Sequence, residues 1–198
     1  MNKLVFSLIK RSNSTLRNVV RETSNFKMIS RMYATKYNKI KVRENTFFYE
    51  TRDGQNMSDS PLQILKAVLK KNTRSEHFIV YQNRYLDEVL LGLRLNQINI
   101  DKMKNVHLVE RNTPSYVEAQ LFSKYLITDS TFQSFFVKKN DQVYVNTWHG
   151  TPLKSMGYAM PEGNFTSWNV MRNFLMSDYL ISPNRHTTDI FLNDYHLN

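Results

Sequence analysis

Six short apolar stretches alternate with segments of helical spacing along this chain, and this alternation restricts its fold more than any other feature. Each stretch is rich in β-branched and aromatic residues, as buried strands are; the stretches are residues 46–50, 77–81, 106–110, 125–128, 143–147 and 179–182. Helices are expected over residues 61–69, 85–100, 114–124, 164–176 and 187–195, the first of them capped by Ser60. Strands that alternate with helices form a parallel sheet. The sequence therefore predicts an α/β fold with a Rossmann-like parallel sheet.

Length and composition agree with a folded domain. The chain has 198 residues, of which 41% are hydrophobic and 13% aromatic. This is enough apolar material to bury a core, and it excludes a disordered polypeptide. The chain has no cysteine, so disulfide frameworks and thiolate-bound metals are excluded.

The net charge of +10 is concentrated at the amino-terminal end. Residues 1–43 contain eleven Lys and Arg residues and one acidic residue, and the rest of the chain is neutral. We therefore divide the chain into a basic arm, residues 1–43, and a folded domain, residues 44–198. Such an arm is attracted to anionic surfaces, and residues 16–33 have the spacing of an amphipathic helix that lies on a membrane. A solvated, poorly ordered tail is the alternative. No apolar run is long enough to cross a bilayer.

The strand expected over residues 143–147 runs into a tight turn that contains His149 and Gly150. Thr151 is expected to cap a following helix with Pro152 at its first position, where a missing N–H costs nothing. His149 would then lie at the carboxyl end of a strand, beside a helix N-terminus. In parallel sheets this is where ligands, and phosphates in particular, bind.

A family resemblance adds to this interpretation. Residues 146–154, Asn-Thr-Trp-His-Gly-Thr-Pro-Leu-Lys, followed by Gly157, resemble the signature of the CDP-glycerol glycerophosphotransferase family, which builds teichoic acid chains. Residues 123–130 and 178–184 resemble the strands on either side of that signature in the family. In all, the resemblance covers roughly residues 30–195.

The resemblance implies a fold and an activity. The family has a two-domain GT-B fold, and the chain resembles its N-terminal, acceptor-side half, with the nucleotide-binding domain apparently absent. The implied reaction transfers glycerol phosphate from CDP-glycerol to a hydroxyl of a teichoic acid or lipid-linked acceptor, without a cofactor. The resemblance implies a peripheral protein on the cytoplasmic face of the cell membrane, held there by the anionic surface of the membrane. The isolated residues are expected to fold but to transfer poorly.

His149 is the predicted catalytic base. Phosphodiester formation requires removal of the hydroxyl proton, and a histidine with the ordinary pKa of about 6.5 can accept it at neutral pH. The alternative is a structural histidine that holds the turn. Gly150 and Thr151 would offer backbone N–H groups to an anion, and Lys154 would meet acceptor phosphates or lie on the surface as an ordinary lysine.

A second polar loop follows the strand over residues 46–50. Glu50, Gly54, Ser58 and Asp59 lie at or beyond the carboxyl end of this strand. Two such loops on one edge of a parallel sheet would face the same crevice, so we assign acceptor or phosphate binding to these residues. A helix cap explains the Ser58–Pro61 segment equally well.

Two other functions compete with this interpretation. One is a GT-B glycosyltransferase that uses a sugar nucleotide, and the other is a non-catalytic module that binds anionic polymer or membrane through the basic arm. No nucleic-acid-binding signature is present, so no nucleic acid partner is expected. The other histidines lack the spacing of metal ligands, and no metal site is predicted.

Overall fold

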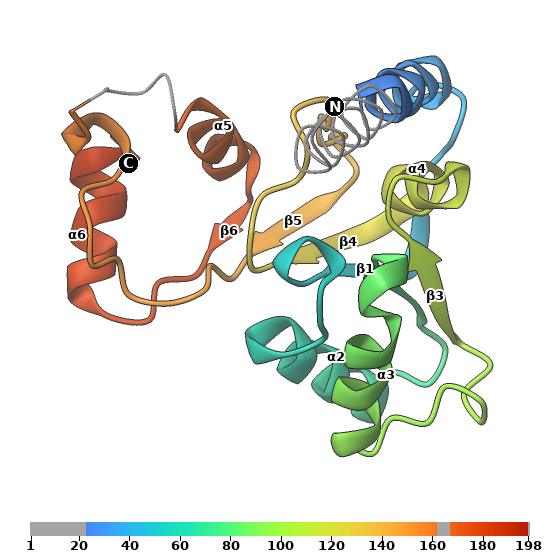
Figure 1. Cartoon of the computed structure of the whole chain (residues 1–198). Helices are drawn as coiled ribbons and strands as arrows, with labels where there is room; N and C mark the ends of the chain where they lie inside the picture. Colours follow the sequence, from blue (N-terminus) through green and yellow to red (C-terminus); the bar gives the residue numbers. More distant parts are fainter. Residues whose placement is uncertain (1–22, 162–166, 198) are drawn as a thin grey trace, which may run out of the picture.

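The structure, a computed structural model, describes residues 23–161 and 167–197. Six parallel strands form one sheet in the order β3-β2-β1-β4-β5-β6 (Figure 1). Their bounds are β1 Arg43–Glu50, β2 Glu76–Tyr81, β3 Val106–Glu110, β4 Ser123–Thr128, β5 Val143–Asn146 and β6 Tyr179–Leu180. This confirms the predicted α/β fold with a parallel sheet.

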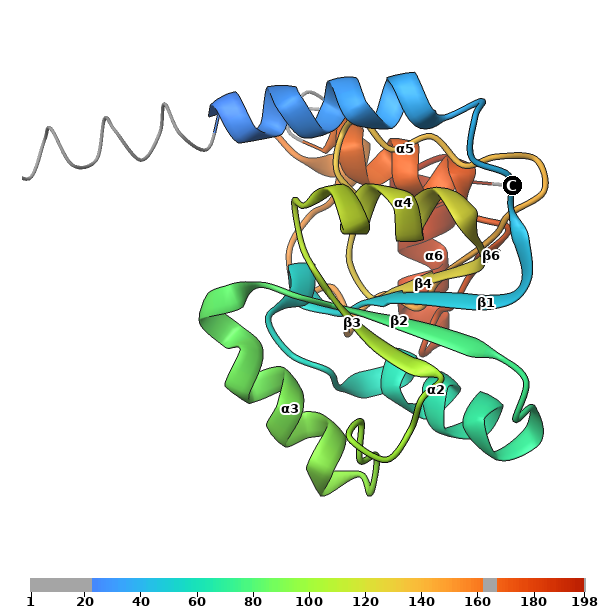
Figure 2. The same cartoon turned by 90° about the vertical axis from the view of Figure 1, so that its right-hand side faces the viewer.

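Helices cover both faces of the sheet. Their bounds are α2 Asp59–Lys71, α3 Leu86–Leu95, α4 Pro114–Phe122, α5 Trp168–Met176 and α6 Arg185–Asp194, with a further helix over residues 23–36 and short 3-10 helices at Arg52–Gly54, Asn83–Tyr85 and Gly157–Ala159. Figure 2 shows α4 and the helix of residues 23–36 on one side of the sheet and α2 and α3 on the other. The sheet is thus the middle layer of three.

The alternation of side chains along each strand supplies a core to both faces. In β1, Phe47 and Tyr49 pack with residues of α2 and α3, such as Leu65. Phe48 points to the opposite face and packs with residues of α4, such as Tyr116. Glu50, two residues beyond Phe48, lies on that same face and is buried there.

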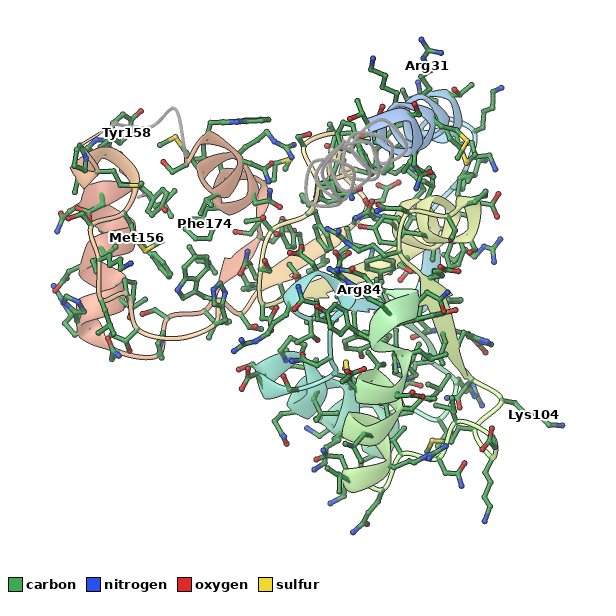
Figure 3. The ribbon with its side chains drawn as sticks, in the orientation of Figure 1. Arg31, Arg84, Lys104, Met156, Tyr158 and Phe174 are labelled. Atoms are coloured by element: carbon green, nitrogen blue, oxygen red, sulfur yellow. The ribbon has the colours of Figure 1, made fainter. Side chains whose placement is uncertain are left out.

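A separate apolar cluster holds the last two helices together. Phe174 of α5, Phe191 of α6 and Tyr195, which directly follows α6, form this carboxyl-terminal cluster, and Trp148 packs against it. Figure 3 shows Met156 and Phe174 directed into the space between α5 and α6. Gly157 has a positive φ of +54°, and an added Cβ would lie 2.0 Å from the Asp194 carbonyl oxygen. The chain after the turn at His149 is therefore pressed against α6.

Part of the expected basic arm packs on the folded domain. The helix of residues 23–36 buries Ile29 and Tyr33 in the core on the α4 face, and the Tyr33 hydroxyl donates to the Val137 carbonyl at 2.8 Å. Its main apolar contacts are thus with protein, whereas the sequence suggested a helix over residues 16–33 lying on lipid; residues 1–22 lie outside the described ranges. Among the described helices, none is long and apolar enough to cross a bilayer.

Two predicted helix starts are wrong. Thr151 does not cap a helix, because residues 151–156 are not helical. A helix begun at Pro152 would meet the positive φ of Gly157 after one turn, so it could not propagate. The helix nearest this segment is α6, and its cap, Asn184, donates from Nδ2 to the Thr151 hydroxyl at 2.8 Å. Helix α2 begins at Asp59 with Ser58 as its N-cap residue, two residues before the predicted cap at Ser60.

His77 in β2 makes folding sensitive to pH. Its ring is fully buried, bonds to the Tyr49 hydroxyl and the Ser75 hydroxyl, and stacks on Phe47. Burial lowers the pKa of His77 from 6.5 to about 4. Below pH 6.5 the unfolded chain therefore takes up a proton that the folded chain refuses, so stability rises with pH and is lost as the pH falls towards 4.

We expect the His77 contribution to lower the free energy of unfolding by about 2 kcal/mol between pH 7 and pH 5, from the shift of its pKa. Urea unfolding at both pH values measures this loss. In the His77→Gln variant the loss should shrink by that amount, whereas His186→Gln, which changes an exposed histidine, should keep it. Equal losses in the His77→Gln variant and the unmodified chain would contradict the prediction.

Candidate active site at the switch point of the sheet

The loops that follow β1, β4 and β5 meet at one edge of the sheet. Chain connections run in opposite directions from β1 and β4, so the strand order reverses between them, and such a switch point is where open α/β sheets bind ligands. A pocket of about 240 Å³ lies here, lined by Arg52, Asp53, Gln55, Ser130 and His149. The loop after β1 and the turn at His149 thus face one pocket, and among the predicted site residues His149 alone is in its lining.

His149 is hydrogen-bonded to the backbone of Asp129, and the residue is exposed. Nδ1 lies 2.6 Å from the carbonyl oxygen of Asp129. Because a carbonyl can accept but not donate, Nδ1 carries the proton and donates it. In the neutral ring this tautomer leaves the Nε2 lone pair free of a proton, and the residue is exposed. Nε2 is therefore the atom that can accept a proton from a substrate.

Trp148 fixes the direction of the neighbouring imidazole. Its backbone has a φ of +54°, an uncommon value for a residue of this size, and its N–H donates to Asn146 Oδ1 at 2.9 Å. The centroid of its indole lies 4.4 Å from that of the His149 ring, and the indole packs edge-on against Phe174 and Phe191. The turn is thus anchored in the carboxyl-terminal cluster.

Gly150, Thr151 and Lys154 continue from His149 along an exposed segment. Gly150 has a φ of +129°, which requires glycine, although a Cβ there would meet nothing within 4 Å. Since no helix begins at Thr151, a helix dipole does not strengthen anion binding at these N–H groups, and binding by Gly150, Thr151 and Lys154 stays a prediction.

The loop after β1 is strained and tightly held. Arg52, Asp53 and Gly54 have φ values of 43°, 58° and 80°. The Gln82 side chain donates to the Asp53 carbonyl at 2.8 Å, and its backbone N–H donates to the Gly54 carbonyl at 2.7 Å. A Cβ on Gly54 would lie 3.1 Å from the backbone of Tyr81. Gly54 thus lets the loop pack closely on the end of β2.

A buried ion pair lies beneath this loop. The Arg111 guanidinium donates to Glu50 Oε1 at 2.7 Å and to Asp53 Oδ1 at 3.0 Å. Tyr116 donates its hydroxyl proton to Glu50 Oε2 at 2.8 Å. Burial raises the pKa of Glu50, and the charge of Arg111 opposes that rise. Glu50 therefore faces the interior and holds the loop from below.

The other predicted residues of this loop lie near the surface. The Ser58 hydroxyl donates to Asn56 Oδ1 at 3.1 Å. The Asp59 carboxylate is exposed, and its Oδ2 lies 3.8 Å from Nη2 of Arg52. Roles for Glu50, Gly54, Ser58 and Asp59 in acceptor binding stay predictions.

Asp129, which was not among the predicted site residues, joins the two loops. Asp129 is fully buried, its Oδ1 accepts the Arg52 backbone N–H at 2.8 Å, and its carbonyl accepts from His149. Burial raises the pKa of Asp129, and the hydrogen bond from the Arg52 backbone N–H opposes that rise. The signal for this residue was its place directly after the strand over residues 125–128. Among the described residues, no three His, Cys, Asp or Glu side chains are grouped to hold a metal ion.

Comparison with known proteins assigns the chain to a family. The family model of CDP-glycerol:poly(glycerophosphate) glycerophosphotransferase matches residues 31–198. The chain belongs to this family. Curated glycerophosphotransferases support the assignment: the chain is 30% identical over 157 residues to a teichoic acid poly(glycerol phosphate) polymerase of Staphylococcus epidermidis and 27% identical over 157 residues to one of Bacillus spizizenii.

Solved structures of the wall teichoic acid polymerase TagF have the same fold as this chain. One of them superposes with a TM-score of 0.68 at 24% identity and covers 93% of this chain. This confirms the prediction of half of a GT-B-like fold. The chain spans 45% of that TagF chain, and 20% and 37% of the lengths of the Staphylococcus and Bacillus relatives.

Proposed function

We propose that this chain is the acceptor-side part of an enzyme that transfers glycerol phosphate from CDP-glycerol to a hydroxyl of a teichoic acid or lipid-linked acceptor. The observation that carries the proposal is the bond from His149 Nδ1 to the Asp129 carbonyl, because it leaves Nε2 as a proton acceptor in a pocket at the switch point of the sheet. Family membership supplies the reaction class.

His149 would act as the general base of the transfer. The acceptor oxygen forms a bond to the phosphorus that bears the glycerol, and its proton passes to Nε2. The bond from that phosphorus to the oxygen of cytidine monophosphate breaks, and cytidine monophosphate leaves. A base within hydrogen-bond reach of the attacking hydroxyl contributes about 10²–10⁴-fold to such a step. Gly150, Thr151 and Lys154 are proposed to contact the phosphates of the acceptor chain.

The acceptor would be met at an anionic membrane surface, on the cytoplasmic side. Lys27 and Arg31 lie on the helix of residues 23–36, and Figure 3 shows Arg31 directed away from the domain. Phe26 and Met28 of the same helix are 40% and 50% exposed. Each basic residue near such a surface contributes about 1 kcal/mol of attraction.

A donor screen with the full-length gene product tests the proposal. CDP-glycerol, CDP-ribitol and UDP-glucose are supplied with a poly(glycerol phosphate) acceptor in anionic vesicles, and nucleotide release and acceptor extension are measured. We expect CDP-glycerol to be used at least about tenfold better than UDP-glucose, with rates that fall as salt screens the vesicle surface. Transfer from UDP-glucose in preference to CDP-glycerol would instead identify a glycosyltransferase.

A further inference from the structure

The loop over Arg52–Gly54 holds a costly conformation that the proposed role of His149 leaves unexplained. Left-handed backbone at a residue other than glycine costs about 1–3 kcal/mol and persists where its surroundings enforce it. Here Arg52 and Asp53 adopt that conformation in succession. Gln82, Arg111 and Asp129 each contribute a hydrogen bond that enforces it. Arg52 is thereby brought to the wall of the pocket that also contains His149.

The Arg52 guanidinium is free to bind an anion. Its side chain is 54% exposed, and its nearest carboxylate oxygen, on Asp59, is 3.8 Å away, which is beyond hydrogen-bond length. The acidic side chain in the pocket wall, Asp53, is bound to Arg111. A phosphate fits a guanidinium well, because two parallel N–H groups match two of its oxygens.

Asp129 sets the separation between this cation and the base. Its carboxylate accepts the backbone N–H of Arg52 at 2.8 Å, and its own carbonyl accepts the ring N–H of His149 at 2.6 Å. The second carboxylate oxygen, Oδ2, is buried and has no hydrogen-bond partner among the described residues. Asp129, directly after β4, thus fixes the position of the loop after β1 relative to the turn after β5.

We propose that this pocket binds the terminal glycerol phosphate unit of the acceptor, with its phosphate on Arg52 and its hydroxyl at Nε2 of His149, and that Asp129 is the positioning residue that fixes their separation. The inference rests on the proposed function and adds to it the site of the acceptor phosphate. The terminal glycerol phosphate unit has a hydroxyl at one end of three carbons and a phosphate at the other. Its binding therefore requires a base, His149, and a cation, Arg52, in the same small pocket.

Binding to the chain itself tests the site without any transfer. The probe is sn-glycerol 3-phosphate, followed through the imidazole NMR signals of His149, which are identified by their loss in His149→Ala. We expect this probe to shift those signals and glycerol at equal concentration to leave them unchanged. Arg52→Gln should weaken binding at least about fivefold, since it removes a charge-assisted contact, whereas Arg74→Gln, at the opposite end of the strands, should leave it unchanged.

Asp59 provides a variant with the opposite expected sign. If phosphate competes with the Asp59 carboxylate for Arg52, Asp59→Asn should tighten binding of glycerol 3-phosphate about twofold or more, in line with removal of a surface charge. Asparagine is well tolerated at the left-handed φ of 53° found there. Unchanged binding in both Arg52→Gln and Asp59→Asn, or equal shifts with glycerol, would overturn the inference.

Transfer kinetics of the full-length gene product separate this inference from the proposed function. Arg52→Gln should raise the KM for acceptor at least about fivefold with little change in kcat, as loss of uniform binding does. Asp129→Ala should raise the same KM, and Asp129→Asn, which keeps an oxygen acceptor for the Arg52 N–H, should restore it.

A normal acceptor KM in Arg52→Gln, with transfer lost in His149→Ala, would overturn the site of the phosphate alone. Normal transfer in His149→Ala would instead overturn the proposed function.

Discussion

His149→Ala is expected to lower the rate of glycerol phosphate transfer at least about a hundredfold, the effect of removing a general base. The reason is the tautomer of His149. Because Nδ1 donates its proton to the Asp129 carbonyl, Nε2 has a free lone pair and can accept the proton of the acceptor hydroxyl. His149 is exposed, so the free energy of unfolding should change little. The measurement is the initial rate of CDP-glycerol-dependent acceptor extension by the full-length gene product, together with urea unfolding.

The matched control for His149→Ala is His186→Ala. His186 is also exposed, and its Nε2 donates to the Pro152 carbonyl at 3.3 Å, close to the same turn. Its removal should leave the rate within about twofold, as surface substitutions away from the chemistry usually do. If His149→Ala transferred at a near-normal rate, His149 would have no part in proton removal.

Arg111→Met is expected to destabilise the fold by about 3–5 kcal/mol, the cost of leaving a buried charge without its partner. Glu50 is 1% exposed, and without Arg111 its carboxylate would keep the bond from Tyr116 but lose its counter-ion. Asp53 would lose its partner as well. Since a protonated Glu50 carries no charge, the loss measured by urea unfolding at pH 7 should shrink at pH 5.

Two further variants decide the origin of this effect. Arg94→Met replaces an exposed arginine at the end of α3 and should change the unfolding free energy by less than about 0.5 kcal/mol. Combining Arg111→Met with Glu50→Gln removes both charges and should recover part of the loss, because a neutral pair costs less to bury. If the double variant were less stable than Arg111→Met alone, the uncompensated charge would not be the cause.

The fold was largely predictable because its signals are local. Each strand is a short apolar run whose alternate residues reach both faces, as Phe47 and Phe48 do, and the helices between them have their own apolar spacing. Parallel pairing then follows from the length of the connections. The prediction of a helix after Thr151 was wrong because it rested on neighbouring residues alone. The Thr151 hydroxyl instead accepts a hydrogen bond from Asn184, the cap of α6, which is distant in the sequence.

The candidate site was predictable in part. Position after a strand identified His149 and the loop beyond Glu50, and parallel topology brings such ends together. Asp129 and Arg111 also follow strands directly, but that position does not predict their roles, because these consist of contacts between distant segments. Arg111 meets Glu50 across 61 positions of the chain, and Asp129 meets Arg52 across 77. Such pairs become visible when the strand order is known.

The packing of Trp148 on Phe174 and Phe191 has a mechanical consequence. Trp148 contacts the imidazole of His149 on one side and the last two helices on the other, so the orientation of the imidazole depends on where these helices lie. Loosening those helices would let the ring swing although no group in the pocket had changed. The position of His149 Nε2 therefore depends on the packing of α5 and α6 as much as on the turn itself.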